Sequence, residues 1–384
     1  MTGSVFKRLR RWWWSPQSRS VLLVVALLSS SGAGNAQGLL DEYTLRHWNV
    51  EDGLPEGLIL SIKQMPDGFL WLTTPHYVVR FDGVRFEKLP DEQPRAGLPG
   101  GFRQFYVDRQ GKQWICGNEG VLRFDRNAWQ PVPLVGGTNA IGPPTAKETP
   151  DGQVVTSGKL EFFCIGEDPD GKVMAASTRG VHLFNGQELV FVPMPTAQAG
   201  APPIITGAAI DSRGEVWLAA DEHLVRFKEG VYREETFPAE LRARGFYQVV
   251  TAGADVVWVQ QVDGRLFRHS DGRWSEVVPG GLRVNSVLET AGPTTSWVGS
   301  VERLSRWKSG TWQVLGGAAG DFPRDVRCLE LARDGCLWVG TSSGLYRLAH
   351  RSVRMFPTGP NLAQRPITAL WPASTNEFWA GTTG

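Results

Sequence analysis

Residues 66–74 read PDGFLWLTT, a turn that ends in glycine followed by an apolar strand with a tryptophan at position 71. The same pattern returns as RQGKQWICG at 109–117, SRGEVWLAA at 212–220 and RDGCLWVGT at 333–341. Less regular copies place Met174, Trp258, Trp297 and Trp379 at this marker position. Successive markers are 43, 60, 43, 41, 39, 41 and 41 residues apart, and one insertion accounts for the longest interval. A regular period of this length indicates a repeat architecture rather than unrelated domains.

A second signal follows the marker and defines the rest of the unit. It reads VVRFDG at 78–83, VLRFDR at 121–126 and LSRWKSG at 304–310, and a further short strand comes after it. The residue two positions past the marker is small in every copy except one, where Gln260 stands. Four short strands joined by glycine turns within about 40 residues are typical of a β-propeller blade. The predicted fold class is therefore all-β, because the periodicity of a helical solenoid is absent.

The number of markers predicts a ring of seven blades. Markers 71 to 338 define seven units, and Trp379 begins an eighth that stops at Gly384 before its third strand. The segment Tyr43 to Trp48 stands in the place of a fourth strand without a blade of its own, so we expect it to close the ring on the unit around Trp338. The predicted domains are a sensor propeller over 37–348 and the start of a second propeller over 349–384. An eight-bladed ring is the alternative, and an end inside a repeat suggests a fragment or a prematurely ended reading frame.

The first 36 residues have the features of a secretory signal peptide. Lys7, Arg8, Arg10 and Arg11 precede an apolar run at 21–28, and small residues follow at 34–36. The run is about half the length that spans a bilayer, so an uncleaved anchor is the alternative. The predicted location is periplasmic or otherwise extracytoplasmic.

Composition and charge exclude several classes of protein. Apolar residues make up 41% and charged residues 21%, which does not fit a disordered chain, and 45 glycines with 16 tryptophans fit turns between aromatic-rich strands. The leader holds five basic and no acidic residues, which leaves 35 against 39 and a formal charge of −4. No basic field is available for nucleic acid. The four cysteines, Cys116, Cys164, Cys328 and Cys336, form no CxxC pair and predict buried free thiols, with Cys328 opposite Val339 in its hairpin.

One known family shares the repeat. WNVEDGLP at 48–55, followed by DGFLWLTT and VVRFDG, resembles the two-component regulator propeller repeat, whose usual form is near GLP, DGxLWxGT and GLxRFDG. The resemblance covers residues 43–384 and implies the exported sensor region of a hybrid two-component receptor, a sensor histidine kinase or a diguanylate cyclase. Such receptors continue into a membrane helix and an output domain, so membrane attachment would need a region beyond Gly384. A receptor homodimer is one arrangement that the resemblance allows.

Departures from the repeat suggest where a ligand would bind. Gly120, Gly180, Gly264 and Gly344 lie six residues past the marker, and Tyr77, His223 and Arg303 replace that glycine elsewhere. These loops share one face of a propeller with the inter-blade connections, including the insertion from Leu134 to Lys159. Our hypothesis is a polar ligand site over the central channel, bordered by the insertion and by His76, Tyr77, His223, Glu302 and Arg303. The alternative is a degenerate repeat with ordinary surface residues.

Chemical motifs are absent from the sequence. No HExxH, GxSxG or P-loop occurs, so we predict no catalytic residue, no metal ligand and no cofactor. Two functional classes remain open. The first is a sensor propeller that binds a small molecule such as a saccharide, as the resemblance implies. The second is a protein-binding platform, or a propeller lyase or hydrolase.

Overall fold

The computed structural model describes most of the chain between residues 42 and 351. The described residues are 42–89, 101–136 except 119, 126 and 127, 160–195, 203–238 except 221, 245–278 except 253–255, 284–289, 295–315 except 309 and 323–351, with the strands at 146–148, 154–156, 367–372 and 378–382. The predicted leader at 1–36 lies outside these residues, as does most of the insertion at 134–159. The chain divides into two units, Met1–His350 and Arg351–Gly384. Among the described residues, no helix is long and apolar enough to cross a membrane.

The first unit is built mainly of seven four-stranded antiparallel sheets, and in six of them these four strands follow one another in the chain. The first three are β2 (Ser61–Gln64), β3 (Leu70–Thr73), β4 (Val78–Phe81) and β5 (Phe86–Lys88); β6 (Phe102–Val107), β7 (Gln113–Gly117), β8 (Gly120–Asp125) and β9 (Ala128–Pro131); and β13 (Phe162–Glu167), β14 (Val173–Ser177), β15 (Gly180–Phe184) and β16 (Leu189–Pro193). The next three are β17 (Ile205–Ile210), β18 (Val216–Ala220), β19 (His223–Lys228) and β20 (Val231–Glu234); β21 (Phe246–Ala252), β22 (Val256–Gln261), β23 (Leu266–Ser270) and β24 (Arg273–Val278); and β25 (Val284–Glu289), β26 (Thr295–Ser300), β27 (Leu304–Lys308) and β28 (Thr311–Leu315). The third sheet carries a fifth strand, β10 (Leu134–Val135), which pairs in parallel with β16. The strands β11 (Ala146–Glu148) and β12 (Val154–Thr156) form a separate two-stranded sheet.

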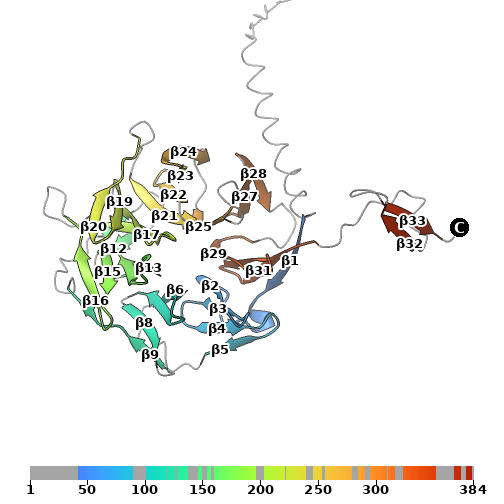
Figure 1. Ribbon diagram of the computed structural model, residues 1–384, viewed down its shortest axis with the longest axis horizontal. Coiled ribbons are helices and arrows are strands. Elements are labelled where there is room, and N and C mark those ends of the chain that lie inside the picture. The colour runs from blue at the N-terminus through green and yellow to red at the C-terminus, as the bar shows by residue number, and fades with distance from the viewer. Residues whose placement is uncertain are drawn as a thin grey trace, which may run out of the picture. The chain divides into compact units, whose positions relative to one another are not determined.

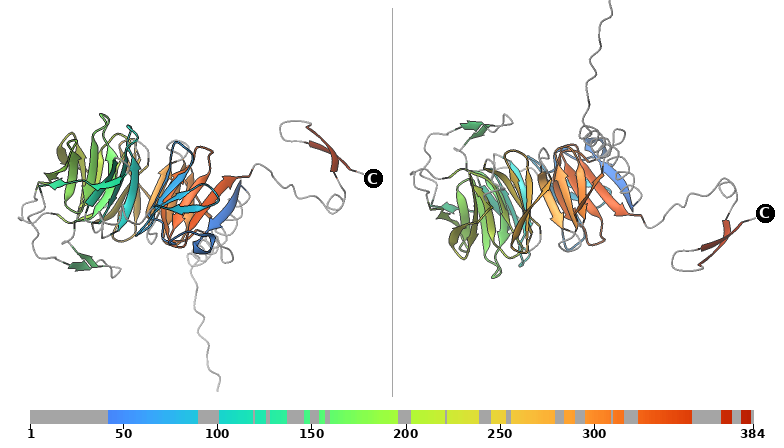
Figure 2. Two further views of the ribbon diagram at one scale, coloured as in Figure 1. Left: turned by 90° about the horizontal axis from the view of Figure 1, so that it is seen from below. Right: turned by 90° about the horizontal axis from the view of Figure 1, so that it is seen from above.

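The seventh sheet joins the two ends of the unit. It contains β29 (Val326–Leu331), β30 (Leu337–Thr341) and β31 (Leu345–His350), and its fourth strand is β1 (Tyr43–Trp48) from the start of the chain. A short 3-10 turn, η1 (Val50–Asp52), follows β1 and leads to the first sheet. The first strands of the seven sheets contact one another in sequence, and β29 contacts β2, so the sheets form a closed ring of seven blades around a central channel (Figure 1). The views of Figure 2 show these blades edge on, side by side. The predicted fold class is confirmed.

Ring closure follows from the pairing of β1 with β31. Tyr43 lies opposite His350 and Trp48 opposite Leu345, which confirms the predicted role of Tyr43 to Trp48. In the neighbouring blade, the guanidinium group of Arg306 donates to both carboxylate oxygens of Glu42, at 2.7 and 2.9 Å. The pKa of Glu42 is lowered, chiefly by this hydrogen bond, so the carboxylate stays charged and the contact persists at neutral pH.

The second unit is described by its own hairpin. The strands β32 (Ile367–Pro372) and β33 (Phe378–Thr382) form a two-stranded sheet of their own, with Trp371 opposite Trp379. Because the ring closes without them, the alternative of an eight-bladed ring is wrong. Whether this hairpin begins a second propeller stays a prediction.

A cross-strand pair of tryptophan and arginine explains the marker of the repeat. In six blades the marker Trp on the second strand lies directly opposite an Arg on the third: Trp71 and Arg80, Trp114 and Arg123, Trp217 and Arg226, Trp258 and Arg268, Trp297 and Arg306, and Trp338 and Arg347. In five of these pairs the guanidinium carbon lies 5.2–5.9 Å from the centre of the indole ring, within the range of a cation–π contact. The blade with Met174 substitutes an apolar pair with Leu183. The recurring arginine is therefore part of the scaffold.

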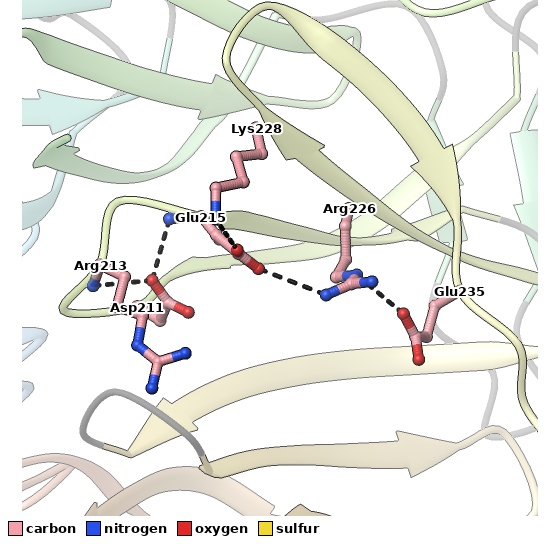
Figure 3. A network of polar contacts seen from close by, with 6 residues as sticks. All are labelled: Asp211, Arg213, Glu215, Arg226, Lys228 and Glu235. Carbon is pink, nitrogen blue, oxygen red and sulfur yellow. Dashed lines mark hydrogen bonds and ion pairs between the residues drawn. The ribbon is translucent and has the colours of Figure 1, made fainter. Parts of the chain in front are cut away.

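Ion pairs extend this scaffold in the fourth blade (Figure 3). Arg226 contacts Glu215 at 3.5 Å and Glu235 at 2.7 Å, and Lys228 contacts Glu215 at 2.7 Å. Burial raises the pKa of Glu215, but the hydrogen bond and charge of Lys228 and the charge of Arg226 outweigh it, so the pKa lies below its usual value. In the nearby turn, Asp211 accepts hydrogen bonds from the backbone N–H groups of Arg213 and Glu215. The side chains thus hold the turn between β17 and β18 in one conformation.

The cysteines are free thiols, as predicted. Cys116, Cys164 and Cys336 are buried and Cys328 is partly buried. Burial raises the pKa of Cys116 to about 12, which keeps its thiol protonated and unreactive. The predicted register of Cys328 is wrong by one residue, because it lies opposite Gly340 rather than Val339.

Candidate ligand site at the channel mouth

The two faces of the propeller differ in the kind of loop they carry. Each first strand begins at the face that also carries the loops between second and third strands; we call it the loop face. The opposite turn face carries the Asp-Gly turns, such as the one at Asp334 and Gly335, where φ of Gly335 is 78°. On the loop face, Gly180, Gly264 and Gly344 have φ of 141°, 87° and 146°, a region of backbone conformation that favours glycine.

The first strand of each blade is its innermost strand. Nearly every innermost strand begins with a β-bulge at the loop face. The register shifts between the first and third residues of β6, β13, β17, β21, β25 and β29. In β6, for example, Phe102 lies opposite Gly117 and Gln104 opposite Cys116, which leaves Arg103 without a partner in the ladder. A bulge redirects the extra side chain away from the regular pleat. The repeat therefore carries one redirected residue per blade in six blades.

Four of the six redirected residues line a cavity of about 530 Å³ at the mouth of the channel. Arg103, Phe163, Thr206 and Arg327 come from the bulges of four blades, and Leu60, just before β2, supplies the equivalent position in the first blade. Pro75, Asn118 and Gln248 add to the wall. A cavity of this size lies within the range of about 300–1,000 Å³ that is usual for small-molecule sites. Several blades supply the residue at the same place in the repeat, so the repeat sets the geometry of the wall while the sequence at the bulges contributes to its chemistry.

The contacts of Arg103 hold its guanidinium group in the wall of the cavity. Its Nη2 donates to Oε2 of Glu161 at 2.6 Å, and its Nε donates to Oδ1 of Asn118 at 3.3 Å. The guanidinium carbon also lies 5.6 Å from the centre of the Phe163 ring. The side chain of Arg103 is 40% exposed, so it is oriented by its neighbours but remains accessible to a ligand.

The second arginine of the wall, Arg327, is oriented by an aspartate in an unusual backbone conformation. Its Nη2 donates to Oδ2 of Asp325 at 2.8 Å. Asp325 has φ of 47°, in the left-handed region that non-glycine residues rarely adopt. Its N–H donates to the carbonyl oxygen of Val301 at 2.7 Å, and its carbonyl oxygen accepts from the N–H of Ser342 at 3.2 Å. These two hydrogen bonds hold the strained residue, and with it Arg327, at the loop face.

Gly117 is required for the bulge that presents Arg103. A Cβ atom at this position would overlap the carbonyl oxygen of Gly101, the same oxygen that accepts a hydrogen bond from the N–H of Asn118 at 3.0 Å. We expect Gly117→Ala to lower the free energy of unfolding by about 1–3 kcal/mol, because the backbone must move to relieve the overlap. Chemical denaturation would measure this loss. Gly111→Ala is the comparison for backbone strain alone, since a Cβ there meets nothing within 4 Å but its φ is 79°. A Gly117→Ala variant as stable as the unaltered protein would show that close approach plays no part at Gly117.

The structure places the five residues predicted from the sequence in three separate loops of the same face. His76 contacts Glu56, with Nδ1 and Oε1 2.7 Å apart, and the ring of Tyr77 lies 4.6 Å from the ammonium group of Lys88. Glu302 and Arg303 belong to the loop between β26 and β27, where the N–H of Arg303 donates to Ser300 Oγ. None of the five is among the described residues that line the axial cavity, although Pro75 adjoins His76. Their role in binding stays a prediction.

His223 instead lines a smaller cavity of about 280 Å³ between the third and fourth blades. Its Nδ1 lies 2.8 Å from Oε1 of Glu234, and Met194, Pro195 and Tyr232 supply apolar surface. This cavity is separate from the channel mouth. Of the five residues, His223 lines this smaller cavity and none lines the axial one, so whether they border one ligand site stays a prediction.

Sequence reasoning did not identify Arg103, Thr206, Asn118 or Arg327. The signal was present in weak form, because each residue that a bulge redirects is the second residue of an innermost strand. That position varies freely, as Arg103, Phe163, Thr206 and Arg327 show, within strands whose other positions are constrained by packing. Among the described residues, no group of three or more His, Cys, Asp or Glu side chains is placed to hold a metal ion.

The fold and the axial cavity define a seven-bladed propeller with a small-molecule-sized cavity at one face, and comparison with solved structures places it among propellers of several functions. Streptogramin B lyase is similar with a TM-score of 0.59 and 15% identity, over 82% of this chain and 99% of that chain. The extracellular domain of BT4673 from B. thetaiotaomicron, described as that of a hybrid two-component system, has the same TM-score and identity, over 86% of this chain and 45% of that chain. YCF48 from Cyanidioschyzon merolae gives 0.58 and 14% identity, over 80% and 99%.

These likenesses establish the fold. At identities of 14–15% they do not transfer an activity. No family model matches the sequence, and no curated protein matches it. The fold neighbours thus include a lyase, YCF48 and an extracellular domain described as that of a two-component system, so the fold alone does not specify a function.

Proposed function

We propose that this chain is the ligand-sensing, extracytoplasmic propeller of a bacterial signal-transduction receptor of the two-component regulator or diguanylate cyclase type. The observation that carries the proposal is the axial cavity, whose wall is assembled from bulged residues of several blades. A ligand in this cavity would contact neighbouring blades at once. Binding would therefore change the mutual packing of the blades, which is what a sensor has to transmit.

Three further features support this function. The repeat motif resembles the two-component regulator propeller repeat, and a two-component extracellular domain is among the fold neighbours. The N-terminal 36 residues have the composition of an export signal, which fits a sensor outside the cytoplasm. The cavity is polar at Arg103, Asn118, Gln248 and Arg327 and has the size of a small-molecule site, which suits a saccharide or a similar polar ligand.

A catalytic function receives less support from the cavity. The described residues that line it include no histidine and no carboxylate, the groups that most often act as general base or acid. A binding role requires only the hydrogen-bonding groups that the wall contains. We therefore propose recognition rather than turnover, and the lyase and the protein-binding platform remain alternative functions for the same fold.

The purified protein, screened by thermal shift against a saccharide library, provides the test. A ligand that binds only the folded state at 100 times its Kd stabilises it by about 2.7 kcal/mol, which raises the melting temperature by several degrees. We expect at least one saccharide to do so. The triple variant Tyr77→Gly, His223→Gly and Arg303→Gly distinguishes the two candidate sites, because unchanged binding in this variant would place the ligand in the axial cavity. Loss of binding in the triple variant would show that the ligand binds at the loops that carry these three residues. A library without any stabilising member would contradict the sensor function.

A further inference from the structure

The wall of the axial cavity is unbalanced in charge. The described residues that line it include two arginines, Arg103 and Arg327, and neither an aspartate nor a glutamate. The acidic partners of these arginines, Glu161 and Asp325, do not belong to the lining. The surface that a ligand meets therefore carries positive groups, while the compensating negative charges lie beside them.

Both arginines have donor groups to spare. Among the described contacts, Arg103 donates through Nε and Nη2, and Arg327 donates through Nη2 alone. A guanidinium group carries five N–H donors, so the Nη1 group of Arg103 and the Nε and Nη1 groups of Arg327 stay available. Each side chain is 40% exposed. Paired donors of this kind suit the oxygens of a carboxylate or a phosphate, which they can bind at two points at once.

We propose that the axial cavity recognises a small polar molecule that carries an anionic oxygen group, a carboxylate or a phosphate, and that Arg103 and Arg327 bind this group. The inference rests on the proposed ligand-sensing function and specifies the class of ligand. Thr206, Asn118 and Gln248 would bind the neutral polar part, and the ring of Phe163 offers an apolar surface beside Arg103. A charge-assisted hydrogen bond is about twice as strong as a neutral one, so the anionic group would dominate the selectivity.

Glu161 provides the most specific test, because it competes with the ligand for Arg103. Its Oε2 lies 2.6 Å from Nη2 of Arg103, and the backbone of Glu161 is held separately by hydrogen bonds with Thr178. Glu161→Gln would keep the size of the side chain and its ability to accept a hydrogen bond but remove its charge. We expect this variant to bind an anionic ligand more tightly and a neutral ligand unchanged, an effect that a merely structural role would not produce.

The experiment compares matched ligands by isothermal titration calorimetry on the purified protein. The ligands are D-glucose, D-glucuronate and D-glucose 6-phosphate, with the corresponding galactose series. We expect an acid to bind at least tenfold more tightly than its neutral sugar, and Arg103→Met with Arg327→Met to abolish the difference. Arg273→Met is the control, since this exposed arginine lies at the turn face, at the start of β24. Added salt should weaken binding of the acids more than that of the sugars.

Each outcome distinguishes this inference from the function on which it rests. Preference for glucuronate identifies a carboxylate, and preference for the sugar phosphate identifies a phosphate; both support the inference. Equal affinity for the acids and their neutral sugars overturns the inference while the sensor function stands. The same holds if only a neutral saccharide stabilises the protein in the library screen. If neither the six titrated compounds nor any member of the library binds, both proposals fail.

Discussion

Replacing Trp48 by alanine is expected to lower the free energy of unfolding by about 3–5 kcal/mol, the range for truncating a buried aromatic side chain. The indole of Trp48 is 4% exposed. It stacks on Trp338 of the seventh blade, with ring centres 5.5 Å apart, and meets Phe81 of the first blade edge to face at 5.2 Å. Trp48 thus joins the first and last blades at the one junction of the ring where they are far apart in sequence.

Urea denaturation combined with amide hydrogen exchange would test this expectation. Trp129→Ala is the matched control, because Trp129 is 6% exposed and also lies on a fourth strand, β9, but within a blade that is continuous in sequence. Both variants should lose stability by a similar amount. Only Trp48→Ala should also speed exchange along β31, because loosening β1 leaves the amides of that strand without partners. Unchanged protection of β31 would show that Trp48 does not secure the closure.

The closure itself could be predicted from the sequence because it follows from counting. Trp48 and Phe356 each stand 23 residues before a marker tryptophan, so Tyr43 to Trp48 had to be a fourth strand that lacks its own blade. A propeller with an unpaired β31 edge would be prone to aggregation, which leaves pairing with β1 as the stable solution. Repeat number and strand order are therefore accessible from spacing alone.

The channel mouth was not accessible in the same way. A bulge shifts the pairing of two strands by one residue. The spacing of the sequence repeat holds only within one or two residues, so it cannot reveal such a shift. The same kind of error placed Cys328 opposite Val339 instead of Gly340. Arg103 and Arg327 thus look in the sequence like ordinary polar residues of a strand. Tyr77, His223 and Arg303 were easier to notice because they interrupt a recurring glycine, but an interruption identifies a loop and not a cavity.

A buried histidine in the third blade is expected to make the protein unstable to mild acid. His182 is 2% exposed, and its ring lies between those of Phe162 and Phe191, with centres 5.0 and 5.2 Å away. Its Nε2 lies 3.0 Å from the hydroxyl of Ser177, and its buried Nδ1 has no hydrogen-bond partner. Burial, and to a lesser degree the charge of Arg179, lowers the pKa of His182 to about 4 from its usual value of 6.5. The folded state therefore holds this imidazole in its neutral form.

The direction of the pH dependence follows from these two pKa values. The unfolded chain takes up a proton near pH 6.5 and the folded chain only near pH 4, so the stability that His182 contributes is complete above pH 6.5 and is lost as the pH falls to 4. The total loss is roughly 3 kcal/mol, since each pKa unit corresponds to about 1.36 kcal/mol. Urea denaturation at intervals between pH 7.5 and 4 would measure it. The carboxylates and the other histidines also make the free energy of unfolding depend on pH. The informative quantity is therefore the difference in this pH dependence between variants.

His182→Gln should flatten this dependence, because glutamine does not titrate, even if the variant is less stable at pH 7. His223→Gln is the control, since His223 is exposed on the loop face and its replacement should leave the contribution of His182 intact. The expected result is a smaller difference in stability between pH 7 and pH 4.5 for His182→Gln than for the control. Parallel curves in both variants would mean that the third blade accommodates a charged imidazole, for which Phe162 and Phe191 offer no compensating polar group. A flattened curve in His182→Gln alone would identify this one buried ring as the site where acid destabilises the blade.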